Sequence, residues 1–370
     1  MFVSLPVELQ RECVRGLDLE SLKAFRLVSK TTLALPTEEL FSTVGLMPSD
    51  ESVERYTNII NDEKLNPLVR KVVFNTSDDP NSTDEEESKL LESYADAMKS
   101  LGRFEKLKEV GVRFAQECAD SPPWSLFVRT KVLEALFEGT ENSKHSAVNV
   151  NCLTIKNLQD VTSSSIYESD NFHSFRSRLK QLHLDITTET DDLSPEHSIE
   201  LDNLHIGFDC DLPLHWLEPL QPQLTDLSIF SNTFWGFYPD CNLQDIHFPN
   251  LKSLSLGNWN IVHDWQIDWI LSHGTTLREL FLDDCGIVTL LRMTEKQIPE
   301  EWSGLPVFLD GGMESHYVKE ITMRWHEVFP RFQSDLPQLQ RFSLGKGDWD
   351  WGTQFEERYE LTPRLLETRC

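Results

Sequence analysis

The side chains best suited to covalent chemistry are two cysteines that lie among aspartates. Residues 283–285 read Asp-Asp-Cys, which places two carboxylates directly before Cys285, and residues 209–211 place Cys210 between two aspartates. A cysteine becomes a nucleophile as its thiolate, which needs positive charge nearby, and neighbouring carboxylates have the opposite effect. Both segments are therefore interpreted as chemically inert ends of strands.

Other arrangements that support catalysis or metal binding are missing from the sequence. The eleven histidines are dispersed, and the seven cysteines include no pair separated by two residues, so neither a zinc site nor a disulfide framework is expected. The sequence also has no glycine-rich phosphate loop, nucleophile elbow or HExxH helix. We therefore expect a protein that is not an enzyme, that needs no cofactor or metal, and that keeps its cysteines as reduced thiols.

The tryptophans are the more informative residues. Nine of the ten follow residue 200, and three of these, Trp259, Trp349 and Trp351, come directly after predicted strands in the segments GNWN and GDWDW. Large amphipathic rings in such positions most often cover the ends of a structure. An aromatic set among carboxylates also suits a partner protein that carries Lys or Arg side chains.

A six-residue phrase of the form L-x-x-L-x-L returns ten times and predicts the elements that would position these residues. Each copy ends in a period of two, which is typical of a short strand. Segments with helical spacing lie between copies, for example from Ser88, Pro123 and Asp264, so strand and helix alternate along the chain. The copies begin at Val69, Leu107, Val150, Leu179, Leu201, Leu224, Leu251, Leu277, Val318 and Leu339.

Such units stack into a parallel sheet backed by helices, because no unit can bury its leucines alone. In this respect the region from residue 39 to residue 370 resembles a leucine-rich-repeat solenoid. Its repeats are irregular, and most copies lack the asparagine that usually follows the third leucine in that family. An ordinary α/β domain with leucine-rich strands is the alternative.

The variable positions of each phrase are expected to face outward on the concave side of the sheet, where charges of both signs mix with aromatic rings. Such variety favours recognition of a protein surface over recognition of a polyanion. Together with the tryptophans, these positions give the candidate residues for binding a partner protein. They are Phe230, Trp259, Phe281, Asp283, Arg324, Trp349 and Trp351.

The first forty residues carry a dense set of apolar side chains and predict three short helices. Pro6 suits the first turn of a helix, Asp18 can cap a second helix, and Ser29 can cap a third that runs up to Pro36. A piece of this size cannot hide all its apolar side chains and be stable alone, so some of them must dock onto another surface. That surface belongs either to the rest of this chain or to another protein.

The order and spacing of these residues resemble an F-box. The matching segments are Leu5-Pro6-x-Glu8-Leu9, Leu17-Asp18, Leu22 and Leu27-Val28-Ser29-Lys30. The resemblance implies that residues 1–38 bind the Skp adaptor of a Skp-cullin-F-box ubiquitin ligase. Cys13 is smaller than the aliphatic residue usual at its position, and Thr32 stands where many members have an aromatic residue, which would lower the affinity for the adaptor. By resemblance, the adaptor contacts are Leu5, Pro6, Leu9, Cys13, Leu17, Leu22 and Val28.

The F-box-like segment is followed directly by a predicted strand from Leu40 and a predicted helix that stops near Pro67, with no flexible linker. The expected fold class is therefore α/β. It consists of a short all-helical F-box at residues 1–38, followed by a leucine-rich-repeat-like solenoid of parallel strands and helices at residues 39–370.

The overall composition narrows the classes of partner. The chain is 39% hydrophobic and 26% charged, as in ordered water-soluble proteins, and its net charge of -27 with a pI near 4.7 opposes binding to nucleic acid or anionic lipid. No segment is long and apolar enough to span a bilayer, and the first residues do not resemble a secretory signal. A cytoplasmic or nuclear protein with no nucleic-acid or membrane partner is expected.

These observations predict the substrate-recognition subunit of a Skp-cullin-F-box ubiquitin ligase. Its F-box would bind the Skp-type adaptor, and through it the cullin scaffold, while the solenoid would bind an unknown substrate protein. The subunit would catalyse nothing itself. The alternative is a leucine-rich-repeat scaffold that binds proteins without any ligase role, with the N-terminal helices capping the first repeat.

Overall fold

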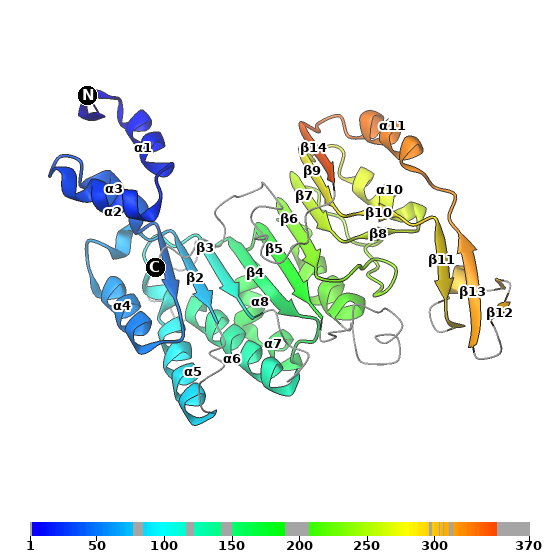
Figure 1. Cartoon of the computed structure of the whole chain (residues 1–370), viewed down its shortest axis with the longest axis horizontal. Helices are drawn as coiled ribbons and strands as arrows, with labels where there is room; N and C mark the ends of the chain where they lie inside the picture. Colours follow the sequence, from blue (N-terminus) through cyan, green and yellow to red (C-terminus); the bar gives the residue numbers. More distant parts are fainter. Residues whose placement is uncertain are drawn as a thin grey trace. The chain divides into compact units, whose positions relative to one another are not determined.

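The computed structural model describes residues 2–76, 84–115, 122–141, 150–188, 207–295, 298–302, 304–305, 307–310 and 314–345. The chain divides into two compact units. Among the described residues, the first holds those up to Leu158 together with Ser163–Leu179, and the second holds Gln159–Thr162 and those from Lys180 onward. Both units combine helices with parallel strands, so the expected α/β class is confirmed (Figure 1).

The first unit begins with the three expected short helices. They are α1 (Val7–Arg15), α2 (Leu19–Val28) and α3 (Ala34–Leu40), preceded by the single turn η1 (Phe2–Ser4). Asp18 caps α2 as predicted, because its carboxylate accepts a hydrogen bond of 2.7 Å from the Ser21 N–H.

Two details of these helices differ from the sequence-based expectation. Ser29 ends α2 instead of capping α3, and its hydroxyl oxygen accepts a bond of 3.0 Å from the Thr31 N–H in the connecting turn. Pro36 lies inside α3 and does not stop it, since it occupies the first turn, where the N–H that proline lacks has no helical partner.

The rest of the first unit alternates strands and helices. Its strands are parallel and lie in the order β1, β2, β3 and β4, while α4, α5 and α6 lie next to one another on one side of them (Figure 1). The bounds are β1 (Thr43–Leu46), α4 (Asp50–Asn61), η2 (Asn66–Leu68), β2 (Lys71–Asn75), α5 (Asp84–Met98), η3 (Leu101–Arg103), β3 (Glu109–Arg113), α6 (Pro122–Glu141), β4 (Cys152–Gln159), α7 (Ser164–Tyr167) and α8 (Asp170–Arg176).

The second unit continues the alternation with five parallel strands in the order β5, β6, β7, β9 and β14. Its bounds are β5 (Gln181–Thr187), η5 (Gly207–Leu217), η6 (Glu218–Leu220), β6 (Asp226–Ser231), β7 (Ser253–Gly257), α10 (Asp264–Ser272), β9 (Glu279–Asp283), α11 (Trp325–Asp335) and β14 (Arg341–Gly345). Smaller strand sets comprise β8 (Asn260–Ile261) with β10 (Gly286–Ile287), and β11 (Leu290–Met293) with β13 (Glu314–Glu320) and β12 (Val307–Asp310), beside the turn η8 (Glu300–Trp302).

One backbone connection recurs at the start of successive strands. The carbonyl group just before a strand accepts hydrogen bonds from two consecutive N–H groups at the start of the next strand, as when the Arg70 carbonyl receives bonds of 2.8 and 3.1 Å from Lys108 and Glu109. The repeated phrase thus produces a repeated geometry. The accepting carbonyls belong to Ser42, Arg70 and Lys108 in the first unit, and to Lys180, Thr225, Lys252 and Arg278 in the second.

A second recurring feature is a left-handed residue that lies near the end of a strand or directly after it. Asn157, Asn258 and Asp284 have φ values of 58°, 56° and 51°, a conformation that Asn and Asp tolerate better than other side chains. The buried Asn157 amide donates a bond of 2.8 Å to the Phe114 carbonyl, and the Asn258 amide donates one of 2.7 Å to the Ser231 carbonyl. Each amide therefore ties the end of one strand to the end of the preceding one.

Most predicted elements are present at their expected places. The strand expected from Leu40 is β1, the helix after it is α4, and the helices expected from Ser88, Pro123 and Asp264 are α5, α6 and α10. The phrase that begins at Leu201 lies outside the described residues.

One of the ten phrases is wrongly assigned to the parallel sheet. The phrase from Val318 falls in β13, which pairs antiparallel with both β11 and β12. Its strand is placed by a hairpin with β12 rather than by a helical crossover, and a parallel partner requires such a crossover.

Candidate protein-docking surfaces

The N-terminal helices leave large apolar side chains uncovered. We call this set the N-terminal apolar surface, and it comprises Val7 and Leu9 of α1, Leu27 and Val28 of α2, and Leu33 just before α3. Their exposed fractions are 48%, 52%, 87%, 68% and 42%. Isolated exposed leucines are ordinary, but five such side chains within 27 consecutive residues are typical of a surface that another protein covers.

The structure separates the predicted adaptor contacts into accessible and inaccessible ones. Leu9, Val28, Pro6 and Cys13 are exposed. Leu5 and Leu17 are partly buried.

Leu22 differs from the expectation, because its side chain is fully buried. The buried residue of α1 is Val14, only 2% exposed, one position after the predicted contact Cys13. Val14 and Leu22 are the buried side chains of α1 and α2, and Leu22 is therefore a stability residue of these helices rather than a contact with another protein.

Sequence reasoning missed three members of the N-terminal apolar surface as contacts, namely Val7, Leu27 and Leu33. Leu27 directly precedes Val28, and Val7 lies two residues before Leu9. The F-box resemblance, from which the predicted contacts were taken, did not include them, and the exposed set follows no single helical stripe because it spans α1, α2 and the residue before α3. The signal available in the sequence was an apolar excess larger than three short helices can bury.

Polar and aromatic contacts hold α2 against its neighbours. The Arg26 guanidinium lies 5.4 Å from the centre of the Phe41 ring, and its Nε donates a bond of 3.0 Å to the Thr37 hydroxyl. Phe25 packs edge to face with Phe2 at 5.0 Å between ring centres. Phe25 therefore takes part in packing within the helices. These contacts hold the exposed side chains around it in fixed positions.

A small cavity of about 200 Å³ lies between α1, α3 and the residues that precede β2. Arg11 reaches Glu38 across it at 3.4 Å, and both side chains are about half exposed, so this ion pair adds little stability. The lining residues are Arg11, Val14, Arg15, Leu35, Glu38, Glu39, Ser42, Leu68 and Arg70. The lining carries both arginines and glutamates, so its charge favours neither anionic nor cationic ligands.

The candidate partner-binding residues of the second unit are gathered on its strands, but they are enclosed. Phe230 on β6 and Phe281 and Asp283 on β9 alternate with the core leucines of their strands, and their exposed fractions are 6%, 5% and 8%. The Arg341 guanidinium lies 4.9 Å from the centre of the Phe281 ring. The expected outward-facing positions therefore offer little free surface.

Trp259 lies in the core rather than in a binding loop. Its side chain is fully buried and packs against Trp235 and Trp269 at ring-centre distances of 5.9 and 6.2 Å. Gly236, with φ of +103°, presses its backbone against the same indole, where a Cβ atom would meet the ring at 2.5 Å. The indole is therefore enclosed, which is the commoner role of a large amphipathic ring.

Of the remaining predicted contacts, Arg324 binds within its own loop and the other two lie outside the described residues. Arg324 stands at the N-cap of α11, and its guanidinium donates bonds of 2.5 and 2.7 Å to the Ile321 and Met323 carbonyls, so it stabilises its own loop. Trp349 and Trp351 lie outside the described residues.

The environment of Cys285, one of the two cysteines near aspartates, disfavours a thiolate. Burial raises the pKa of the Cys285 thiol, and the charges of Asp283 and Asp284 raise it further. Its sulfur donates a hydrogen bond of 3.2 Å to the Leu256 carbonyl. The Cys285 thiol therefore stays protonated, as the sequence interpretation of an inert strand end requires. Within the described residues, no three His, Cys, Asp or Glu side chains are grouped as a metal site would need.

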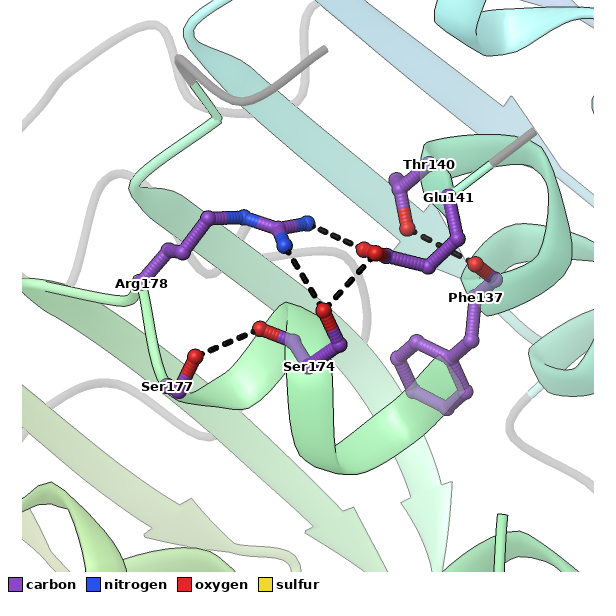
Figure 2. Close-up of polar contacts among 6 residues, drawn as sticks. All are labelled: Phe137, Thr140, Glu141, Ser174, Ser177 and Arg178. Carbon is purple, nitrogen blue, oxygen red and sulfur yellow. Dashed lines mark hydrogen bonds and ion pairs between the residues drawn. The ribbon is translucent and has the colours of Figure 1, made fainter. Parts of the chain in front are cut away.

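A polar cluster in the first unit joins α6 to the end of α8 (Figure 2). The Arg178 guanidinium contacts the Glu141 carboxylate, which also accepts a bond of 2.7 Å from the Ser174 hydroxyl. The same hydroxyl accepts a bond of 3.1 Å from Arg178. Both charged side chains are about one fifth exposed, so the cluster is a partly buried clamp between two helices.

Comparison with known proteins adds little. No protein-family model matches the chain, and no curated protein matches it. A solved structure of a protein from Bacteroides fragilis aligns with 81% of this chain and 73% of its own, at 14% identity and a TM-score of 0.30. None of the helices in the described ranges combines the length and apolar character that crossing a bilayer requires.

Proposed function

We propose that this chain is the substrate-recognition subunit of a Skp-cullin-F-box ubiquitin ligase. In this role residues 1–38 act as the F-box that binds the Skp-type adaptor, and the repeated strands form a leucine-rich-repeat-like solenoid that binds the substrate protein. The chain itself supplies no chemistry. It would work in the cytoplasm or nucleus, where such ligases act.

The observation that carries the proposal is the N-terminal apolar surface. Its five side chains belong to α1, α2 and the residue before α3, and they remain 42–87% exposed although Val14 and Leu22 of the same helices are buried. Full burial of one Val or Leu side chain is worth about 1.5–3 kcal/mol, so covering the exposed parts of several of them contributes favourably to binding. The F-box-like order of Leu5, Pro6, Leu9 and Leu17 supports an adaptor as the protein that covers them.

The recurring backbone bonds support the solenoid part of the proposal. Carbonyls before successive strands accept paired bonds from the next strand, and the Asn157 and Asn258 amides link strand ends within their units. A repeat array of this kind presents a bound protein in a fixed position. A receptor accelerates modification by holding the substrate lysine near the transferring enzyme, which raises its effective concentration.

The test is co-purification with a Skp-type adaptor. We expect the intact chain to bind the adaptor and the double variant Leu9→Arg, Val28→Arg to lose at least tenfold in affinity. The same substitution at the equally exposed Leu290 of the second unit serves as the matched control and should leave affinity unchanged. Equal binding by the chain and the double variant, or no binding by either, would contradict the proposal.

A second candidate function is a repeat scaffold without any ligase role. It is favoured by the cavity that α1 and α3 share with Leu68 and Arg70, because this cavity places the helices next to the start of β2, where a cap would sit. Deletion of residues 1–38 separates the two functions. A truncated chain that stays folded and loses only adaptor binding supports the receptor, whereas one that aggregates or melts far earlier supports the cap.

A further inference from the structure

Strands β6, β7 and β9 of the second unit carry leucine or isoleucine on one face and a different set of side chains on the other. Successive side chains of a strand point to opposite faces, and these strands pair in register, with Asp226 beside Ser253 and Ser253 beside Glu279. The alternate positions that begin at these three residues therefore line one face of the sheet. We call it the second strand face.

The helices of this unit lie on the opposite, leucine-bearing face. Phe342 of β14 pairs with Leu280 of β9 and contacts the Phe332 ring of α11 at 5.8 Å, and α10 lies beside α11 (Figure 1). The strands follow one another in the sheet in chain order, from β5 through β6, β7 and β9 to β14. Parallel strands added in this way are joined by right-handed connections, which all run on one face. The connections are therefore expected on the leucine-bearing face.

The second strand face is nevertheless buried. Phe230 and Phe281 are only 6% and 5% exposed, and Ser255 is fully buried, with no hydrogen-bond partner for its hydroxyl among the described residues. By contrast, Ser343 of β14, which pairs with Phe281, is exposed. Neighbouring side chains of a sheet shield the edges of a ring but not its outer side. Another part of the chain is therefore needed to cover β6, β7 and β9.

Residues 346–370 are the part of the sequence best placed to do this. The other ranges of this unit outside the described residues lie between successive strands, as residues 189–206 lie between β5 and β6, whereas residues 346–370 follow the last strand and form no connection. The Gly345 carbonyl accepts a bond of 2.7 Å from the Asp284 N–H, so the segment begins beside the end of β9. From β14 to β5 is about 19 Å at about 4.8 Å per strand, and an extended segment of this length reaches about 80 Å.

The aromatic content of residues 346–370 suits a cover for Phe230 and Phe281. Rings packed over these two side chains would exclude water from them, as their low exposure requires. The aromatic residues of the segment are Trp349, Trp351, Phe355 and Tyr359.

Charge also favours this segment over the loop that follows β5. The second strand face carries the carboxylates of Asp226, Glu279 and Asp283. Residues 189–206 contain six Asp or Glu and no Lys or Arg, so this face would repel them, whereas residues 346–370 contain four Lys or Arg beside six Asp or Glu. Cations of the segment can therefore meet the carboxylates of the face.

We propose that residues 346–370 of this chain lie across the second strand face and cover it. The segment holds closed the surface on which a stacked strand array would bind another protein, so a partner must displace it to reach Phe230 and Phe281. The apparent affinity for such a partner is lowered by the fraction of molecules in which the face is covered. That this partner is the substrate rests on the proposed receptor function, whereas the covering itself does not.

The experiment measures how fast a cysteine on the covered face reacts with a maleimide, with each labelled site identified by mass spectrometry. We expect Ser255→Cys to react slowly in the full chain and at least tenfold faster when residues 346–370 are deleted, because Ser255 lies on this face and is fully buried. Leu290→Cys is the exposed control and should react fast in both chains. The natural Cys241, which is fully buried, should stay slow in both and shows that the unit remains folded.

A second measurement uses the full chain and needs no deletion. A photoreactive benzoylphenylalanine in place of Phe355 should crosslink to peptides that contain β6, β7 or β9. This measurement decides the question if Cys241 becomes reactive in the shortened chain, which would mean that the deletion unfolds the unit.

Three results would overturn the inference. Fast labelling of Ser255→Cys in the full chain would show that the face is open. Equally slow labelling in the full and shortened chains, with Cys241 slow in both, would assign the cover to another part of the chain. Crosslinks from position 355 that miss all three strands would place the segment elsewhere. Adaptor binding through Leu9 and Val28 should be equal in the full and shortened chains, so failure here and failure of the proposed function are told apart.

Discussion

The N-terminal helices and the strand face of the second unit make opposite use of similar residues. Both regions are rich in apolar or aromatic side chains, and both were expected to bind a protein. The N-terminal helices leave Leu27 and Val28 87% and 68% exposed, whereas the second unit keeps Phe230, Phe281 and Trp259 at 6% or less. Side-chain type therefore does not distinguish a docking residue from a core residue, but the size of the surrounding structure does, because three short helices cannot enclose what a stacked strand array can.

The largest effect on stability is expected at Trp259, whose side chain is fully buried. Trp259→Ala should lower the free energy of unfolding by about 3–5 kcal/mol, since it empties a fully enclosed site beside Trp235 and Trp269. Chemical denaturation followed by circular dichroism measures the change. A variant of unchanged stability that only failed to bind a partner protein would show that Trp259 is a contact residue. It would contradict the contrast between the enclosed second unit and the exposed N-terminal helices.

Leu22 and Leu9 test the same contrast inside the N-terminal helices. Leu22→Ala should cost about 2–5 kcal/mol of stability, because its side chain is fully buried. Leu9→Ala should change stability by no more than about 0.5 kcal/mol, because half of its side chain is exposed, and should weaken adaptor binding instead. Hydrogen exchange of α1 and α2 measures the first effect locally, and equal stability losses in the two variants would contradict the separation.

His273, a ring in the enclosed aromatic region, should make the stability of the chain depend on pH. Burial, together with the charge of nearby His247, lowers the pKa of His273 to about 4. The neutral ring accepts a bond of 3.2 Å from the Phe248 N–H. Because the unfolded chain binds a proton more readily, this residue's contribution is complete above pH 6.5 and is lost as the pH falls toward 4, by about 3 kcal/mol in all.

We therefore expect the free energy of unfolding, measured by denaturation between pH 7 and pH 4, to depend less on pH in His273→Gln than in the unaltered chain. The substitution His326→Gln is the matched control, since His326 is exposed on α11 and should leave the slope unchanged. An identical slope in all three proteins would show that the His273 ring is not enclosed as the structure has it.

The smallest effect concerns Asn258, whose two roles can be separated. Asn258→Ala should cost about 1–2 kcal/mol, because it leaves the Ser231 carbonyl without its 2.7 Å bond and strains a residue with φ of 56°. Asn258→Gly loses the bond but accepts the backbone conformation, so it should be the less damaging change in thermal denaturation. The opposite order would show that the left-handed turn carries no cost at this position.

The elements were more predictable from the sequence than the exposure of their side chains. Period-two phrases placed β2 and β9 correctly, and Asp18 gave the start of α2, because strand alternation and capping are local properties. The burial of Leu22 was not predicted, since which side of a short helix is covered depends on its neighbours.

Tertiary context also decided the other differences. Trp259 follows a strand as expected, but Gly236 and Trp235 approach from a distant segment and enclose it. The phrase from Val318 has the same pattern as the others, yet the hairpin with β12 places it in a separate antiparallel set. The exposure of Leu27 and Leu33 was hidden for the same reason, because a repeated pattern reports local structure and not what lies over it.

The asparagine links between strand ends have a consequence for how such a chain changes in length. Each amide reaches only as far as the carbonyl at the end of the strand before it, as Asn258 does with Ser231. A strand and its helix can thus be duplicated or removed as one block while the bonds inside every other block stay as they were. Insertion or removal of such a block would leave unequal distances between neighbouring phrases, and the phrases along this sequence are unequally spaced.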